Sequence, residues 1–296
     1  MLSLKGIFPP LPTAFDKDEN LAPAQMQENI RKLSHYGLSG FLVLGSNGEL
    51  VMLNRKEQET VFQACREAIA PGKLMLAGTG GESTRETIEQ TRLAARAGAD
   101  AALVLNPFYY KGQMSPMALQ AHFWAVAEAA KIPVIVYNMP SNTGLDMDAD
   151  TIFSIAEHPN IIGVKDSGGN VVKLGELVAG AKPGFQVLAG SAGFLLPALS
   201  MGATGGILAL ANIAPAQCLE IFQAFHEGDT VRARDMQHRM IAINAAVTRR
   251  WGVPALKAAM DHLGLYGGPA RRPLQPLEEQ VHTQLITLLQ KSLEEN

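Results

Sequence analysis

The chain has 296 residues, of which 47% are hydrophobic and 18% are charged, and its formal net charge is −3. This composition supplies a buried core, argues against intrinsic disorder and shows no basic stripe of the kind that binds nucleic acid. Its apolar runs are interrupted well before the roughly 20 residues that a membrane-spanning helix needs, so we expect no membrane span. Length alone is compatible with two domains or with one large α/β barrel.

Short apolar segments recur along the chain, each followed by a longer segment with helical periodicity. The series occupies residues 6–8, 40–44, 74–77, 101–105, 133–137, 161–165, 185–189 and 205–208. Continuous apolar runs of this length are typical of buried parallel strands. The first of these strands are separated by amphipathic segments that predict helices, at residues 24–36, 55–70, 84–97 and 117–130.

Eight strand–helix units without a compositional break predict an α/β fold, a closed (β/α)8 TIM barrel over residues 1–210. Residues 211–296 are more than one barrel helix requires. Helical segments at 215–225, 231–246 and 277–291 predict a C-terminal helical extension, packed on the barrel to form a single structural unit. A doubly wound open sheet is the main alternative, although no GxGxxG turn follows the first strand, as its dinucleotide-binding version would require.

The cysteines, histidines and N-terminus bear on compartment and metal content. Cys65 and Cys218 lack CxxC spacing, which predicts neither a disulfide framework nor a zinc site. The N-terminal residues run directly into the first predicted strand and leave no room for a signal or transit peptide. The seven histidines form neither an HxH nor an HExxH pair. We therefore expect a cytoplasmic protein without a bound metal.

Lys165 is the most informative residue, because a barrel carries its catalytic groups at the carboxyl ends of its strands. It ends an apolar strand, and desolvation in a barrel mouth favours a neutral, nucleophilic amine. Such an amine condenses with a ketone to an iminium, an electron sink that assists cleavage of the neighbouring carbon–carbon bond. The alternative interpretation is a solvated lysine just outside the strand.

Other strand ends also carry polar residues. Tyr137 and Tyr109 are candidates for proton transfer, although tyrosines at strand ends are more often packing residues. Ser46 and Asn47 lie in a glycine-containing turn whose donors suit a carboxylate. The same turn is also what an ordinary strand-to-helix connection requires. These residues alone therefore leave the chemistry open.

Three motifs resemble those of the dihydrodipicolinate synthase and N-acetylneuraminate lyase superfamily. Residues 163–170 are similar to its Schiff-base segment, residues 137–140 to its proton-relay tyrosine segment, and residues 45–49 to its carboxylate-binding turn. The motifs follow the family's order and spacing, and the resemblance covers essentially the whole chain. It implies a barrel that needs no cofactor, acts on small 2-oxo acids and assembles as a homotetramer, a dimer of dimers.

The resemblance also implies roles for individual residues. Lys165 would be the Schiff-base lysine, Tyr137 the acid/base, and Tyr109 a second tyrosine contributed across a dimer interface. The substrate-binding residues that it implies are Ser46 and Asn47, which would hold the pyruvyl carboxylate, and Ile207, which would touch the keto acid through its backbone.

Asn142 departs from the synthase pattern. Dihydrodipicolinate synthases have an arginine there, whose guanidinium holds a substrate carboxylate. An asparagine does not supply that charge, which puts synthase activity in doubt. Stretches that resemble 4-hydroxy-2-oxoglutarate aldolase instead occupy residues 142–146, 158–161, 185–194 and 244–250. This resemblance implies cleavage of 4-hydroxy-2-oxoglutarate to pyruvate and glyoxylate, with Ser167 as a further pocket residue.

Several alternatives use the same iminium. They are a 4-hydroxy-tetrahydrodipicolinate synthase, a 2-keto-3-deoxy sugar acid dehydratase or aldolase, and a pyrroline-4-hydroxy-2-carboxylate deaminase. Two hypotheses from other classes are a non-catalytic sensor of 2-oxo acids and a metal-dependent class II aldolase. The presence of both Lys165 and Tyr137 argues against the sensor.

Overall fold

The computed structural model describes residues 2–294, in which eight parallel strands form one sheet in the order β1-β8-β7-β6-β5-β4-β3-β2. The strands are β1 (Gly6–Phe8), β2 (Gly40–Val43), β3 (Leu74–Gly78), β4 (Ala101–Leu105), β5 (Val134–Asn138), β6 (Ile161–Asp166), β7 (Gln186–Ala189) and β8 (Gly205–Ile207). A parallel bridge between Pro10 and Leu42 joins the two ends of the sheet. The predicted (β/α)8 barrel is therefore confirmed, and the open-sheet alternative is wrong.

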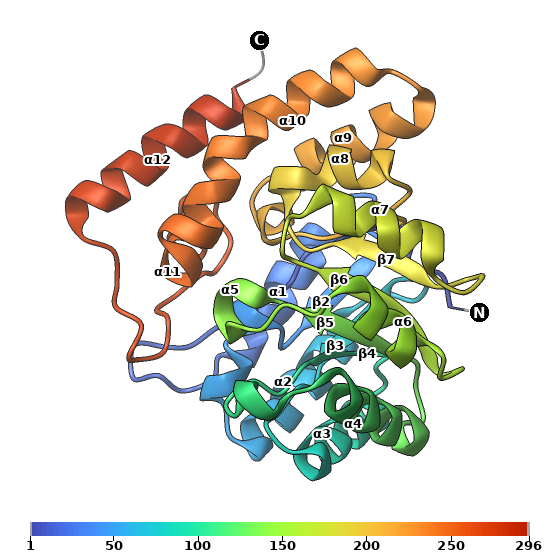
Figure 1. Cartoon of the computed structure of the whole chain (residues 1–296). Helices are drawn as coiled ribbons and strands as arrows, with labels where there is room; N and C mark the ends of the chain where they lie inside the picture. The colour runs from blue at the N-terminus through green and yellow to red at the C-terminus, as the bar shows by residue number, and fades with distance from the viewer. Residues whose placement is uncertain (1, 295–296) are drawn as a thin grey trace.

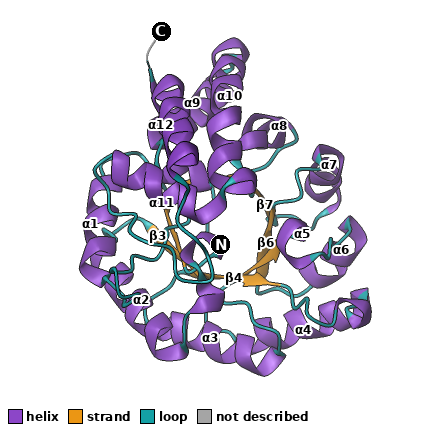
Figure 2. Cartoon of the chain, turned by 90° about the vertical axis from the view of Figure 1, so that its left-hand side faces the viewer, coloured by secondary structure: helices purple, strands orange, loops and turns teal. Residues whose placement is uncertain are grey.

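Helices surround the strands in a ring, which Figure 2 shows looking into the barrel. The ring contains α1 (Pro23–Leu33), α2 (Arg55–Ala68), α3 (Thr84–Arg96), α4 (Pro116–Ala129), α6 (Ala149–Ala156), α7 (Val171–Gly180), α8 (Leu195–Ser200) and α9 (Pro215–Glu227), and the short helix α5 (Pro140–Thr143) follows β5 before α6. Local sequence fixes several helix starts. The side chains of Asn54, Ser83 and Asn170 each accept backbone N–H bonds in the first turns of α2, α3 and α7.

Short turns of helix follow several strands. They are η1 (Ser46–Gly48), η2 (Leu50–Met52), η3 (Lys111–Gln113), η4 (Ala192–Phe194) and η5 (Ala209–Asn212). Because these turns come after the carboxyl ends of β2, β4, β7 and β8, they lie at the end of a barrel that carries functional sites.

The C-terminal region contains three further helices, α10 (Thr230–Ala245), α11 (Gly252–His262) and α12 (Glu279–Leu293), with a π-helical turn η6 (Ala246–Arg250) between α10 and α11. Figure 1 shows α10, α11 and α12 gathered at one side of the barrel. No helix was predicted where α11 lies, and its sequence contains Gly252 and Pro254, two residue types that are unfavourable inside a helix. Both residues lie in its first turn, where the missing N–H of proline breaks no helical hydrogen bond.

The buried side chains form two layers. One fills the barrel interior and includes Phe8, Leu42, Ile135, Leu188 and Ile207. The second and larger layer packs between the strands and the helices. Alternation along strands such as β2 and β5 directs successive side chains into one layer or the other, and the register between β5 and β6 shifts once, between Val134 and Ile135. Within residues 2–294 no helix combines the length and the apolar character that crossing a membrane requires.

Candidate active site

Lys165 and Tyr137 face each other across two neighbouring strands. They are paired in register on β6 and β5, and Lys165 is paired with Leu188 on its other side. Tyr137 and Leu188 both belong to the interior layer, so Lys165 at the same level also points into the barrel. The residue is only 4% exposed, and its Nζ lies 4.1 Å from the centre of the Tyr137 ring. The alternative of a solvated lysine is therefore wrong.

Lys165 differs from the other buried lysines in forming no ion pair with a carboxylate among the described residues. Lys173 and Lys257 are buried as well, and each forms an ion pair with at least one carboxylate. No ion pair formed within residues 2–294 involves Lys165. A buried amine that is not tied to a carboxylate is available to react with an electrophile.

The turn after β2 brings a hydroxyl to the same place. Ser46 begins η1, and its Oγ lies 3.2 Å from the Tyr137 hydroxyl, so that either group can donate. Ser46, Tyr137 and Asn142 line a cavity of about 260 Å³, whose other walls are mostly apolar, including Leu44 and Leu105. A mainly apolar cavity with a few convergent polar groups suits a small organic ligand.

The substrate-binding candidates differ in their burial and in the elements that carry them. Asn47 is half-buried in η1 beside Ser46, Asn142 is exposed on α5, and Ile207 is buried in the barrel interior at the end of β8. Lys165 is not in the cavity lining, and its amine lies against the Tyr137 face instead.

Ser167 follows β6 directly, and its hydroxyl is buried without a hydrogen-bond partner among residues 2–294. Gly190 makes room for this hydroxyl, because a Cβ at that position would stand 1.9 Å from Ser167 Oγ. A buried hydroxyl without a partner is unfavourable unless a ligand completes its hydrogen bonds.

Tyr109 lies away from this group and is 73% exposed. Its ring meets the ring of Tyr110 edge-on, with 5.0 Å between centres, and its backbone N–H donates to Glu82 Oε2 over 2.8 Å. Tyr109 is not part of the lining of the cavity that holds Ser46 and Tyr137, and its predicted role across a dimer interface stays a prediction.

A buried polar network directly outside the barrel was not predicted. Asn138 and Asp166 follow Tyr137 and Lys165 on their strands, so their side chains point to the helix side. The Asn138 amide donates to Asp146 and to Asp166, over 2.7 Å in each case, and Lys173 of α7 pairs with both carboxylates. Although burial opposes its charge, hydrogen bonds to these carboxylates raise the pKa of Lys173.

The sequence held a signal for this network, because each of the two strands ends in two consecutive polar residues. One of each pair faces the barrel interior and the other faces the helices. As for metals, no group of three or more His, Cys, Asp and Glu residues that could hold an ion occurs within the described part of the chain.

The model of the Dihydrodipicolinate synthetase family matches residues 3–292. The chain belongs to this family. The resemblance drawn from the three motifs is therefore confirmed. Membership makes the chain an enzyme, a lyase that uses the lysine Schiff-base mechanism.

Two relatives within the family show the range of reactions. A protein of Emericella nidulans named "Probable 4-hydroxy-2-oxoglutarate aldolase, mitochondrial" is 39% identical over 90% of this chain and 88% of its own length. A 4-hydroxy-tetrahydrodipicolinate synthase of Methanothrix thermoacetophila is 33% identical over 97% of this chain and 96% of its own. Membership thus establishes an aldolase or synthase of this family and leaves the substrate to further argument.

The fold is shared with solved structures of the family. YagE, a prophage protein from E. coli K12 belonging to the family and solved in complex with pyruvate, superimposes with a TM-score of 0.92. It is 31% identical in sequence, and the match covers 98% of this chain and 99% of YagE.

Proposed function

We propose that the chain is a class I aldolase that cleaves 4-hydroxy-2-oxoglutarate to pyruvate and glyoxylate. The observation that carries the proposal is the buried Lys165 amine, which lacks a carboxylate partner among the described residues and lies 4.1 Å from the centre of the Tyr137 ring. The aldolase named among the relatives supports the choice of substrate, and so does Asn142, which stands at the cavity without the positive charge of an arginine.

In the proposed reaction Lys165 Nζ attacks C2 of the substrate, and loss of water from the carbinolamine gives an iminium. Removal of the proton from the C4 hydroxyl releases glyoxylate, as the electrons of the C3–C4 bond pass into the iminium and form the enamine of pyruvate. Protonation at C3 and hydrolysis return the amine and release pyruvate. Tyr137 moves the protons, and the Ser46 hydroxyl at 3.2 Å is a partner for their exchange.

The polar residues around the cavity are assigned to the substrate. Ser46 and Asn47 hold the C1 carboxylate through their side chains and through the backbone N–H groups of η1. Ile207 contacts the keto acid through its backbone at the end of β8. Ser167 offers its otherwise unpartnered hydroxyl, and Asn142 faces the distal half of the substrate.

The second candidate is the 4-hydroxy-tetrahydrodipicolinate synthase reaction, which the 33% identity to a synthase favours. Both reactions use the same Schiff base, so they differ in the second substrate and not at Lys165. The neutral Asn142 supports placing the synthase second, because a guanidinium binds a carboxylate with charge-assisted, bidentate hydrogen bonds that an amide does not form.

The proposal extends to assembly and location. We propose a homotetramer, a dimer of dimers, in which Tyr109 enters the site of a neighbouring subunit. Its 73% exposure in the single chain supports such an external role. We also propose a cytoplasmic location, with which two buried, unbonded cysteines are compatible.

The test is pyruvate release from racemic 4-hydroxy-2-oxoglutarate, followed through a lactate dehydrogenase couple, with Lys165→Ala as the matched variant. We expect rapid release by the wild-type chain and a loss of at least about 10³-fold in the variant, since the covalent route is removed. Borohydride reduction in the presence of pyruvate should place one adduct on the Lys165 peptide. Trapping at Lys165 without release would reject this substrate and keep the Schiff base, whereas an unmodified Lys165 peptide would refute the mechanism.

A further inference from the structure

The η1 turn ends in a buried glutamate with an unusual backbone. Glu49 adopts the left-handed conformation, with φ of 55° and ψ of 33°, and its side chain is 1% exposed. That conformation is unfavourable for a residue with a Cβ, and a buried carboxylate requires charged or hydrogen-bonding partners. The conformation of the turn that carries Ser46 and Asn47 therefore depends on the interactions that hold the Glu49 side chain in place.

The anchors come from the C-terminal region. Lys257 of α11 is 1% exposed, and its Nζ lies 2.6 Å from Glu49 Oε1. The backbone N–H of Arg271 donates to Glu49 Oε2 over 2.8 Å. On the other side of the turn, the Thr13 hydroxyl donates to the Gly48 carbonyl over 2.6 Å. The turn after β2 is thus held by groups more than 200 positions further along the chain and by the loop after β1.

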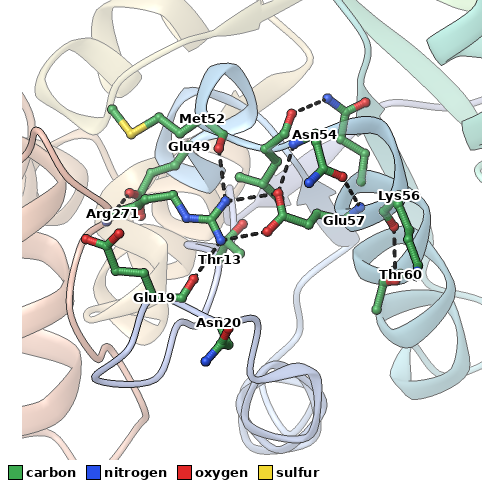
Figure 3. A network of polar contacts seen from close by, with 12 residues as sticks. Thr13, Glu19, Asn20, Glu49, Met52, Asn54, Lys56, Glu57, Thr60 and Arg271 are labelled. Carbon is green, nitrogen blue, oxygen red and sulfur yellow. Dashed lines mark hydrogen bonds and ion pairs between the residues drawn. The ribbon is translucent and has the colours of Figure 1, made fainter.

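The Arg271 guanidinium extends this anchorage, as Figure 3 shows. It donates to the Met52 carbonyl over 2.9 Å and to both oxygens of Glu57, over 3.0 and 2.7 Å. It also donates to the Glu19 carbonyl over 2.7 Å and rests on the Phe15 ring, 4.2 Å from its centre. One side chain therefore ties η2, the first turn of α2 and the loop after β1 together.

Geometry and charge indicate that this network does more than hold the fold together. Buried ion pairs contribute little net stability, because desolvation offsets their attraction, but they fix the arrangement of the groups that they join. Here they fix both ends of the segment from Glu49 to Glu57, next to Ser46, whose hydroxyl lies 3.2 Å from Tyr137. A small displacement of Glu49 would move the donors of η1 relative to Tyr137.

We propose that Glu49, Lys257 and Arg271 are positioning residues for the C1 carboxylate of the 2-oxo acid. They hold η1 so that its donors are arranged for that carboxylate before the substrate arrives, and the C-terminal region thereby controls substrate affinity. This inference rests on the proposed function. Because the C1 carboxylate is bound in the substrate and the transition state alike, losing its alignment raises KM and leaves kcat nearly unchanged.

The experiment is borohydride trapping of the Lys165 adduct over a range of pyruvate concentrations, together with steady-state kinetics. For Arg271→Gln we expect the half-saturating pyruvate concentration and the KM to rise about tenfold, with kcat within about threefold of the wild type. Arg271→Lys retains the positive charge and loses the bidentate contact to Glu57, so its half-saturating pyruvate concentration and its KM should lie between those of the wild type and those of Arg271→Gln. Arg272→Gln is the matched control, since the Arg272 side chain is 77% exposed, pairs only with Glu19 among the described residues, and should change neither constant when replaced.

If Arg271→Gln does not fold, Glu57→Gln tests the same positioning role from the other side of the Arg271–Glu57 ion pair. The Glu57 side chain is 23% exposed, and glutamine at this helix position preserves the cap with Asn54. We expect a smaller rise in half-saturation, about threefold. An unchanged half-saturation in the folded variants, or a fall in kcat at constant KM, would refute the inference while wild-type trapping keeps the proposed function. No trapping in the wild-type chain would refute both.

Discussion

Replacing Lys173 with methionine removes the only cation, within the described residues, that pairs with the buried carboxylate beside Lys165. Asp166 is fully buried, and Lys173 Nζ lies 2.9 Å from its Oδ2. After the substitution, the side chain of Asp166 keeps the N–H donors of Asn138 and Gly168 as its only hydrogen-bond partners within residues 2–294. Asp146 is affected less, because about half of its side chain surface is exposed, so water can replace the ammonium.

The magnitude follows from the geometry. At 2.9 Å and an effective dielectric constant of about 20, the attraction between Lys173 and Asp166 is about 6 kcal/mol before desolvation. Removing one partner of a buried pair leaves the other charge uncompensated and costs roughly 3–5 kcal/mol. For a chain of this length that loss lowers Tm by about 5–8 °C.

Thermal unfolding at fixed protein concentration measures the effect, with Lys56→Met on the exposed side of α2 as the control, which should change stability by less than about 0.5 kcal/mol. The double variant Lys173→Met/Asp166→Asn removes both charges and should recover about half of the loss. A decrease in Tm of less than about 2 °C in the single variant would show that Lys173 and Asp166 do not form a buried charge interaction. The same conclusion would follow if the double variant recovered none of the lost stability.

Two further predictions concern proton transfer and pH. Tyr137→Phe keeps the ring packed against Lys165 and removes the hydroxyl, so kcat should fall about 10²- to 10⁴-fold while borohydride still traps pyruvate; an unchanged kcat would remove Tyr137 from the mechanism. Burial lowers the pKa of His122 from 6.5 to about 4. As the pH falls below 6.5, His122 takes up a proton in the unfolded chain but stays neutral in the folded chain, which favours unfolding. The free energy of unfolding should therefore decrease by about 2 kcal/mol from pH 7.5 to pH 5. In His122→Gln the denaturation midpoint should vary less with pH, and equal slopes in the two proteins would contradict this assignment.

The barrel could be predicted from the sequence because its signals are local. Each strand is a short apolar run between helical segments, and the predicted residues 101–105 coincide with β4. The missed helix, α11, has Gly252 and Pro254 in its first turn, and only the structure shows that these residues start a helix instead of interrupting one. The local sequence therefore predicts most helices and strands. It is least informative about helix boundaries where one helix follows another directly, as α11 follows α10 and η6.

The candidate site could be predicted only in part, for a related reason. Lys165 and Tyr137 each end an apolar strand, and that property is visible in a single segment. The register that sets Lys165 beside Tyr137, and the absence of an ion pair on its amine among the described residues, depend on pairing between strands and on side chains from other segments. Periodicity placed Lys165 and Tyr137 at strand ends, and the expectation that they act together in one site came from the resemblance to a known family.

The positions that no local pattern marks are those that join distant segments. Glu49 and Arg271 are 222 positions apart, and the sequence around either residue does not indicate that the other is its partner. Such pairs also explain how a single barrel can serve several related reactions. In the proposed mechanism Lys165, Tyr137 and the η1 turn act on the 2-oxo acid part of the substrate, whereas Asn142, which lines the cavity from the short helix α5, faces the part that differs between the candidate reactions. Selection can therefore alter α5 and its neighbours without disturbing the Schiff base, provided that the anchors of η1 stay in place.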